Sequence, residues 1–96
     1  EATALRAVFG GRPPWVNAPK SRIGHLSMAC GAVEAVIAVQ ALREDFFPAT
    51  VATGWEGDED CRVRMAPAPG VKGVRSVLKP SFGFGGQNAC LLFRRG

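Results

Sequence analysis

The sequence predicts an α/β chain that forms part of a larger fold. Residues 26–42 form an apolar stretch of helical length, in which only Ser27, Glu34 and Gln40 are clearly polar. Short apolar or alternating runs typical of strands follow in the second half of the chain. A helix without a broad polar face has to be covered on all sides, and 96 residues can hardly cover one.

The first half of the chain predicts three elements in order. Residues 1–9 predict a helix that ends at Gly10. Residues 15–17 predict a short buried strand. Pro19 disfavours helix at the residue before it, and Ser21 is the candidate N-cap of the element that leads into the apolar helix.

The second half predicts mostly strands and loops. After an apolar exit from the helix at residues 46–50, the acidic residues of 53–60 would suit either a bound cation or a solvated loop. The other predicted elements are a half-exposed strand at 61–65, a Pro/Gly loop at 66–73, and strands at 74–78 and 89–94.

Composition and charge exclude several classes of protein. The chain is 47% hydrophobic and 21% charged, which is ordinary for a globular protein and excludes a disordered or collagen-like chain. The net charge is +4, but the basic residues are scattered, so no nucleic-acid partner is expected. The apolar stretch is shorter than the roughly 20 residues of a membrane span, and it contains Glu34. We therefore expect no membrane-spanning helix. No secretion signal is recognised, and a cytoplasmic protein is expected.

The three cysteines, Cys30, Cys61 and Cys90, lie far apart and are odd in number. Their spacing indicates neither a disulfide framework nor a zinc site. We therefore expect reduced thiols and no metal ion.

His25 is the only histidine of the chain, and it follows Gly24 at the start of the apolar helix. Near a helix N-terminus the neutral imidazole is favoured, and its N–H can donate a hydrogen bond to a developing oxyanion. A lone histidine is also compatible with a purely structural role.

Glu34 lies within the apolar helix and must be paired or protonated if it is buried. Lys20 is the nearest basic candidate for a partner. The alternative is that Glu34 lies on a narrow wetted strip with Gln40 and Arg43.

Residues 81–88, SFGFGGQN, alternate phenylalanine with glycine. Phe82 and Phe84 suit a pocket wall, whereas Gly85 and Gly86 suit a tight turn. The segment is not GxGxxG and no helix follows it, so nucleotide binding is not expected.

Two of these segments resemble one known family. Residues 20–50, KSRIGHLSMACGAVEAVIAVQALREDFFPAT, resemble the KSxxGHxxGAAGAxE segment of the β-ketoacyl-acyl-carrier-protein synthases, and residues 81–88 resemble their SFGFGGTN. Residues 1–10 resemble the helix before the first segment, so the resemblance covers essentially the whole chain. It implies a thiolase-like layered α/β fold, of which residues 1–96 are the last part of the C-terminal half, incomplete on its own.

The resemblance also implies an activity. The family joins an acyl thioester to a malonyl thioester on acyl carrier protein by decarboxylative Claisen condensation, in fatty-acid or polyketide biosynthesis. The substrates are carried on phosphopantetheine, and no other cofactor is expected. The expected partners are acyl carrier protein, the upstream remainder of the synthase, and a second subunit in a homo- or heterodimer.

Single residues match the family's motifs. His25 matches the second of the two catalytic histidines, and Lys20 and Glu34 match the motif's lysine and acid. Phe84 matches the aromatic gate, with Phe82 beside it and Gly85-Gly86 as the turn that lets the gate move. None of the cysteines matches the nucleophile, so the nucleophilic cysteine and the first histidine are expected upstream of residue 1.

Some positions depart from the family's pattern, and these departures favour a polyketide-type branch. They are Ala18-Pro19 before the lysine, Ser27-Met28 after the histidine, Lys79-Pro80, and Gln87 in place of threonine. Apart from these, Cys30 stands where the family usually has alanine. One alternative is a non-catalytic, chain-length-determining partner subunit. Another is a free-standing binding module that has kept the motifs as scaffold.

Overall fold

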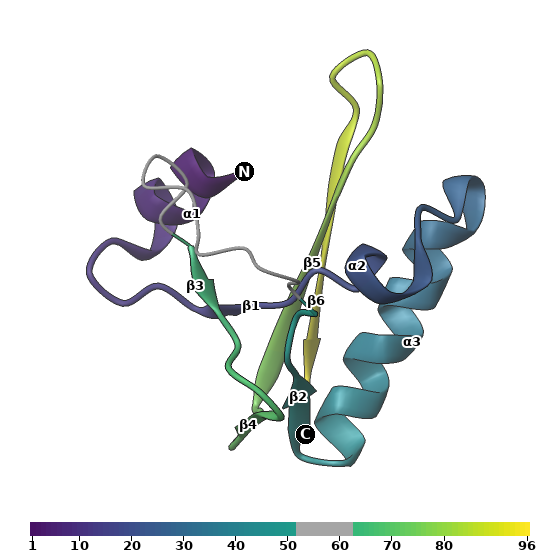
Figure 1. Ribbon diagram of the computed structural model, residues 1–96. Coiled ribbons are helices and arrows are strands. Elements are labelled where there is room, and N and C mark those ends of the chain that lie inside the picture. The colour runs from purple at the N-terminus through teal and green to yellow at the C-terminus, as the bar shows by residue number, and fades with distance from the viewer. Residues whose placement is uncertain (52–62) are drawn as a thin grey trace.

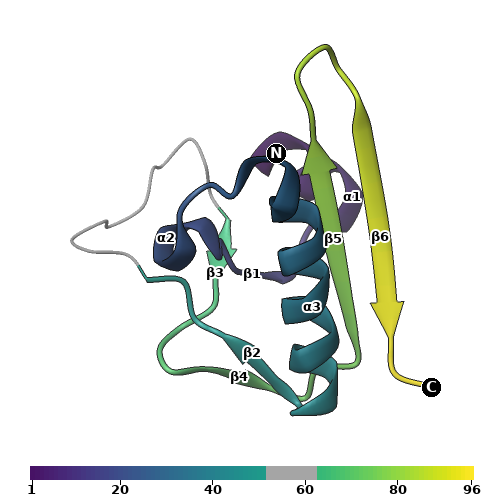
Figure 2. The same ribbon diagram turned by 90° about the vertical axis from the view of Figure 1, so that its right-hand side faces the viewer.

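The computed structural model of the chain describes residues 1–51 and 63–96. Its longest helix, α3 (Cys30–Arg43), lies along a hairpin formed by strands β5 (Ser76–Phe82) and β6 (Asn88–Arg94), as Figures 1 and 2 show. The hairpin is antiparallel and in register from Ser76 opposite Arg94 to Phe82 opposite Asn88. This packing of one helix against two strands confirms the mixed α/β character of the chain.

The core is small and centres on the inner face of α3. The buried hydrophobic residues are Ala38, Ala41, Leu42, Ala49, Ala66 and Val74. Four of them are alanines, and two of these, Ala38 and Ala41, lie on α3. The buried residues come from four separate segments, so the core joins the helix to the segments that pack against its inner face.

The apolar stretch at residues 26–42 forms two elements. It begins as a single 3-10 turn, η1 (Ser27–Ala29), and continues as α3. As expected for 96 residues, the described chain leaves this stretch partly uncovered: Val36 is 62% exposed and Met28 98% exposed. The remaining elements lie on one side of α3 only and leave its other faces open. None of the described helices is long and apolar enough to cross a membrane.

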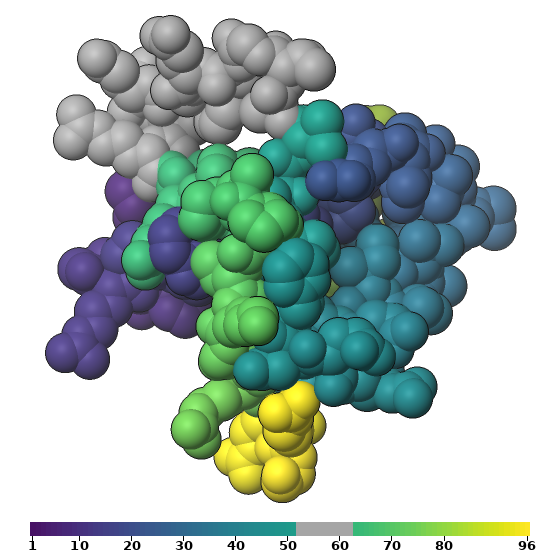
Figure 3. Space-filling model, turned by 60° about the horizontal axis from the view of Figure 1, so that its bottom comes forward, coloured from purple at the N-terminus to yellow at the C-terminus, as the bar shows by residue number. Residues whose placement is uncertain are grey.

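Two further strand pairs complete the described architecture. β1 (Trp15–Val16) pairs in parallel with β3 (Arg64–Met65), and β2 (Phe46–Pro48) pairs antiparallel with β4 (Gly70–Lys72). Figure 3 shows green residues, which include those of β4, beside the teal residues of β2. Each of these sheets has two strands in the described part of the chain.

Several predicted strand boundaries were wrong. The loop predicted at residues 66–73 contains β4, and the strand predicted at 74–78 is β5, which continues to Phe82. β5 extends because its pairing with β6 persists up to the turn. The acidic segment at 53–60 and the first two residues of the strand predicted at 61–65 lie outside the described residues.

The N-terminal elements largely follow expectation. Helix α1 (Ala2–Phe9) and strand β1 form as predicted, although β1 is only half-buried. Ser21 is not an N-cap, because it lies inside the short helix α2 (Lys20–Ile23), where its Oγ donates to the carbonyl of Ala18 at 2.8 Å. The reason is Pro19, whose φ of −59° and ψ of −28° already follow the helix, so the turn begins before Ser21.

Candidate functional site

A wide, open pocket of about 1120 Å³ lies between the start of α3, the segment around α2, and the hairpin. Lys20, His25 and Glu34 line it from the first motif, and Phe82 lines it from the second. The fold therefore brings the two sequence motifs to the same space. Lys79 of β5 also lines this pocket.

A glycine places His25 at the pocket. Gly24 ends α2 with a φ of 72°, a conformation that a residue with a side chain rarely adopts. Its N–H donates to the Lys20 carbonyl at 2.9 Å. The chain then leaves α2 and turns into η1. Lys20 and His25 consequently stand at the two ends of one short helical turn.

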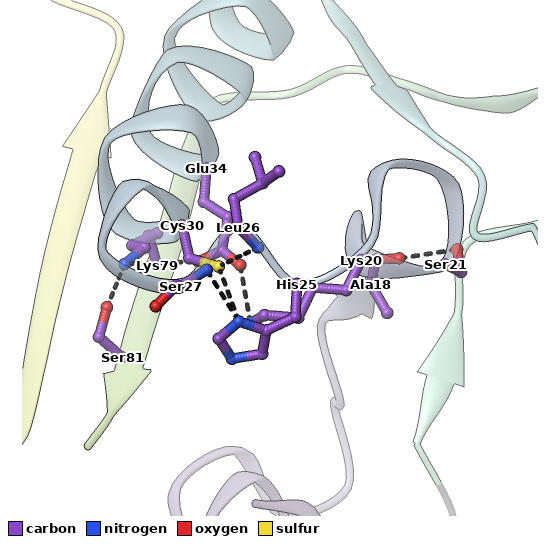
Figure 4. A network of polar contacts seen from close by, with 10 residues as sticks. All are labelled: Ala18, Lys20, Ser21, His25, Leu26, Ser27, Cys30, Glu34, Lys79 and Ser81. Carbon is purple, nitrogen blue, oxygen red and sulfur yellow. Dashed lines mark hydrogen bonds and ion pairs between the residues drawn. The ribbon is translucent and has the colours of Figure 1, made fainter. Parts of the chain in front are cut away.

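The hydrogen bonds of His25 fix its tautomer. The backbone N–H of Ser27 donates to His25 Nδ1 at 2.9 Å. Because a backbone N–H can only donate, Nδ1 is an acceptor here, and the neutral imidazole carries its proton on Nε2. Figure 4 shows the ring extending away from α3. His25 is exposed, so the Nε2–H is available as a hydrogen-bond donor.

Cys30 contacts the same imidazole nitrogen. Its Sγ lies 3.6 Å from His25 Nδ1 and accepts a hydrogen bond from the backbone N–H of Leu26 at 3.1 Å. Cys30 is the first residue of α3. The thiol therefore ties the imidazole to the start of the helix. This contact was not predicted, and only the unusual cysteine in the motif could have signalled it.

Lys20 and Glu34 form the predicted pair. The Nζ of Lys20 lies 3.0 Å from Glu34 Oε1, with the Lys20 side chain 47% exposed and that of Glu34 15% exposed. The hydrogen bond to Glu34 raises the pKa of Lys20 above its ordinary value of 10.5, although partial burial acts in the opposite direction. This geometry supports pairing over the alternative of a wetted strip with Gln40 and Arg43.

A second lysine, which the sequence did not indicate, forms an ion pair with Glu34. The Nζ of Lys79 lies 3.4 Å from Glu34 Oε2 and donates to Ser81 Oγ. Lys79 is only 7% exposed and is the one buried charged residue of the described chain. The period-two pattern of β5 could have revealed it, because Val77, Lys79 and Ser81 lie on the same face of the strand.

The glycine-rich segment forms the tip of the hairpin. Gly85 and Gly86 adopt φ angles of 86° and 81°, and the Gly83 N–H closes the loop on the Gln87 carbonyl at 2.7 Å. The predicted turn is confirmed. Phe84 is fully exposed at this tip, and neither it nor Gly85 and Gly86 lines the pocket, whereas Phe82 does.

Cys30 and Cys90 are free thiols, and Cys61 lies outside the described residues. Residues 1–51 and 63–96 contain no group of three or more acidic, histidine or cysteine side chains that could hold a metal ion. The polar side chains that line the pocket include His25, with its Nε2 side exposed, and the cluster of Lys20, Lys79 and Glu34.

Comparison with known proteins gives a consistent result. The family model of the beta-ketoacyl synthase C-terminal domain matches residues 1–53. The chain is 42% identical, over 99% of its length, to 3-oxoacyl-[acyl-carrier-protein] synthase 2 of Mycobacterium tuberculosis. It is 36% identical over 99% of its length to synthase 1 of Haemophilus influenzae, and 38% identical over 97% to the chloroplastic synthase II of Arabidopsis thaliana.

The chain spans only part of these relatives. It covers 23% of the mycobacterial protein, 24% of the Haemophilus protein and 18% of the Arabidopsis protein. No solved structure gives a significant match.

Proposed function

Because the chain belongs to the family of the beta-ketoacyl synthase C-terminal domain, we propose that it is the last part of the C-terminal half of a thiolase-like condensing enzyme. The whole protein is then a β-ketoacyl-acyl-carrier-protein synthase of the cytoplasm. It joins an acyl thioester to a malonyl thioester with loss of carbon dioxide. The relatives named above are 3-oxoacyl-[acyl-carrier-protein] synthases, which supports this reaction class.

The exposed apolar surface supports the proposal that more of the synthase packs on this chain. Val36 of α3 is 62% exposed, and Leu91 and Leu92 of β6 are 53% and 67% exposed. Covering such apolar faces of a helix and a hairpin stabilises the fold, because it removes apolar surface from water. The upstream part of the synthase, with the nucleophilic cysteine and the first histidine, would provide this cover.

The tautomer of His25 is the observation that carries the proposal. In the condensation, the malonyl thioester loses its carboxylate as carbon dioxide, and the electron pair of the broken C–C bond moves to the α-carbon. The charge is shared with the thioester oxygen, so a hydrogen bond to that oxygen stabilises the transition state. His25 meets this requirement because its proton lies on Nε2 while Nδ1 is held by Ser27.

The second half of the reaction then needs a nucleophilic attack. The carbanion attacks the carbonyl carbon of the acyl group bound to the upstream cysteine, a new C–C bond forms, and the C–S bond to that cysteine breaks. The product leaves on the phosphopantetheine arm of acyl carrier protein, which also delivers the malonyl group. No further cofactor takes part in these steps.

Lys20 provides a fixed positive charge beside this chemistry. An ammonium group has three N–H donors, and Glu34 accepts one of them. In our proposal the other two N–H groups face the substrate. Glu34 keeps the ammonium group in place. Phe82 then forms part of the wall of the acyl site, and Phe84 on the Gly85-Gly86 turn is its gate.

The partners follow from the same proposal. They are acyl carrier protein, the upstream part of the synthase, and a second subunit, which makes a homo- or heterodimer. The presence of Lys20, His25 and Glu34 together supports a catalytic subunit over a non-catalytic, chain-length-determining one.

The test is an assay of the full-length protein with malonyl- and acyl-loaded carrier protein. We expect carbon dioxide release together with a β-ketoacyl product on the carrier, detected by mass spectrometry. A full-length protein that has the upstream cysteine but makes no such product would refute the proposal. A full-length protein without that cysteine, active only when paired with a second synthase, would establish the partner-subunit alternative instead.

A further inference from the structure

We propose that Lys79 is a positioning residue of this site: it binds the oxygen of Glu34 that Lys20 leaves free, and so fixes the carboxylate on which Lys20 depends. This inference rests on the proposed function for its importance in catalysis. The arrangement itself stands on contacts within the chain.

The first support is the division of one carboxylate between two cations. Lys20 reaches Glu34 Oε1 at 3.0 Å, and Lys79 reaches Oε2 at 3.4 Å (Figure 4). Each oxygen therefore has its own partner. A carboxylate that is held at both oxygens cannot rotate away from either lysine without losing a contact.

The second support is the burial of Lys79. A lysine that is only 7% exposed would be costly to keep charged unless it is paired. Its Nζ is paired on both sides, by Glu34 and by the Ser81 hydroxyl. By contrast, Lys20 is half-exposed and can still reach a ligand in the pocket.

The third support is the closeness of the Lys79 ammonium group to α3. A Cβ at Gly31, in the first turn of α3, would lie 3.5 Å from Lys79 Nζ, an ordinary van der Waals contact. The ammonium group of the β5 lysine therefore lies against the first turn of the helix, next to Glu34. Lys79 consequently connects the hairpin that carries the SFGFGG turn to the helix that carries Glu34.

Other charges near Lys20 do not replace this connection. Besides Glu34, the groups that act on Lys20 are the side chains of Cys30 and Glu1. Neither of these holds Glu34. Only Lys79 and Lys20 pair with this carboxylate among the described residues.

The experiment measures the ionisation of Lys20 without any turnover. The full-length protein is treated with an acetylating N-hydroxysuccinimide ester at a fixed alkaline pH, and acetylation of Lys20 is followed by peptide mass spectrometry. In Lys79→Met, the second positive charge next to Glu34 is lost, so the carboxylate attracts the Lys20 ammonium group more strongly. Lys20 then holds its own proton more tightly, and we expect it to react about threefold more slowly. Lys79→Arg keeps the positive charge and should react like the wild type.

Three outcomes decide the matter. Slower acetylation in Lys79→Met with rescue in Lys79→Arg supports the proposal, and an equal or faster rate in Lys79→Met overturns it. If Lys79→Met fails to fold, Lys79→Gln takes its place. If neither neutral variant folds while Lys79→Arg does, Lys79 has a purely structural role and the proposal fails.

The labelling result is independent of the condensation assay. A protein in which Lys79 alters the reactivity of Lys20 but which makes no β-ketoacyl product would retain this inference and lose the proposed function. A protein that makes the β-ketoacyl product, but in which Lys20 reacts at the same rate in every variant, would retain the proposed function and lose this inference.

Discussion

The backbone N–H of Ser27 donates to Nδ1 of His25 across 2.9 Å. Ser27 has a φ of 52°, in the left-handed region that residues with a side chain seldom occupy. Such a conformation costs on the order of 1–3 kcal/mol, and it is common where the backbone serves a functional site. Here it aims an N–H group at the imidazole, which sets the tautomer on which the proposed mechanism depends.

Glu34→Gln tests the charge cluster through stability. The substitution leaves the buried Lys79 without an ionised partner, so we expect the free energy of unfolding of the full-length protein to fall by about 2–4 kcal/mol. Most of this loss should come from Lys79, because the half-exposed Lys20 is screened by solvent. The measurement is urea denaturation at neutral pH.

The matched control is Glu44→Gln, at the exposed C-terminal end of α3. It should change the free energy of unfolding by less than about 0.5 kcal/mol. Equal effects of the two substitutions would show that Glu34 is not the anchor of a cluster.

The pH dependence of stability tests the Lys20–Glu34 pair separately. The pKa of Lys20 is raised by its hydrogen bond to Glu34, so the folded value lies above the unfolded value of 10.5. The contribution of this pair is therefore complete below pH 10.5 and is lost as the pH rises through the folded pKa. Urea midpoints measured at pH values below and above 10.5 should fall more steeply with rising pH in the wild type than in Lys20→Met. Parallel curves for the two proteins would contradict the pairing.

Phe84→Ala tests the proposed gate. The ring is fully exposed in this chain, so its loss should leave the melting temperature of the described fold unchanged. If the ring closes over the bound acyl group, kcat/KM for the acyl donor of the full-length enzyme should fall by about tenfold, because the acyl group is no longer held in position. Val8→Ala, which removes an exposed side chain from α1, serves as the control. Identical kinetics in both variants would remove Phe84 from the site.

The sequence allowed the order of the main elements to be predicted, because periodicity and glycine turns are local signals. Helix α1, the long helix, and the strands of the hairpin could all be predicted in this way. The boundaries of β4 and β5 could not, since they depend on pairing with β2 and β6, and pairing is not visible in local patterns. The same limit applies to Ser21, where the conformation of Pro19 decided the start of α2.

The site could be predicted in part. The Lys20–Glu34 pair followed from the need of a carboxylate in an apolar helix for a cation, and the structure confirms the pair. The period-two pattern could place Lys79 on one face of β5, but its contact with Glu34 depends on the packing of β5 against α3, which no local pattern shows. The polyketide-type assignment stays a prediction, because the relatives are named only as 3-oxoacyl-[acyl-carrier-protein] synthases.

The most direct test of the proposed function compares His25→Ala with Arg22→Ala in the full-length protein. Arg22 lies on exposed α2 outside the pocket lining, three residues before the histidine, and is the matched control. The rate of carbon dioxide release from the malonyl-loaded carrier is measured alongside the melting temperature. We expect His25→Ala to lose activity by a factor on the order of 10²–10³ with an unchanged melting temperature, and Arg22→Ala to retain it. Release of carbon dioxide by His25→Ala at the wild-type rate would contradict the role of this histidine as the hydrogen-bond donor.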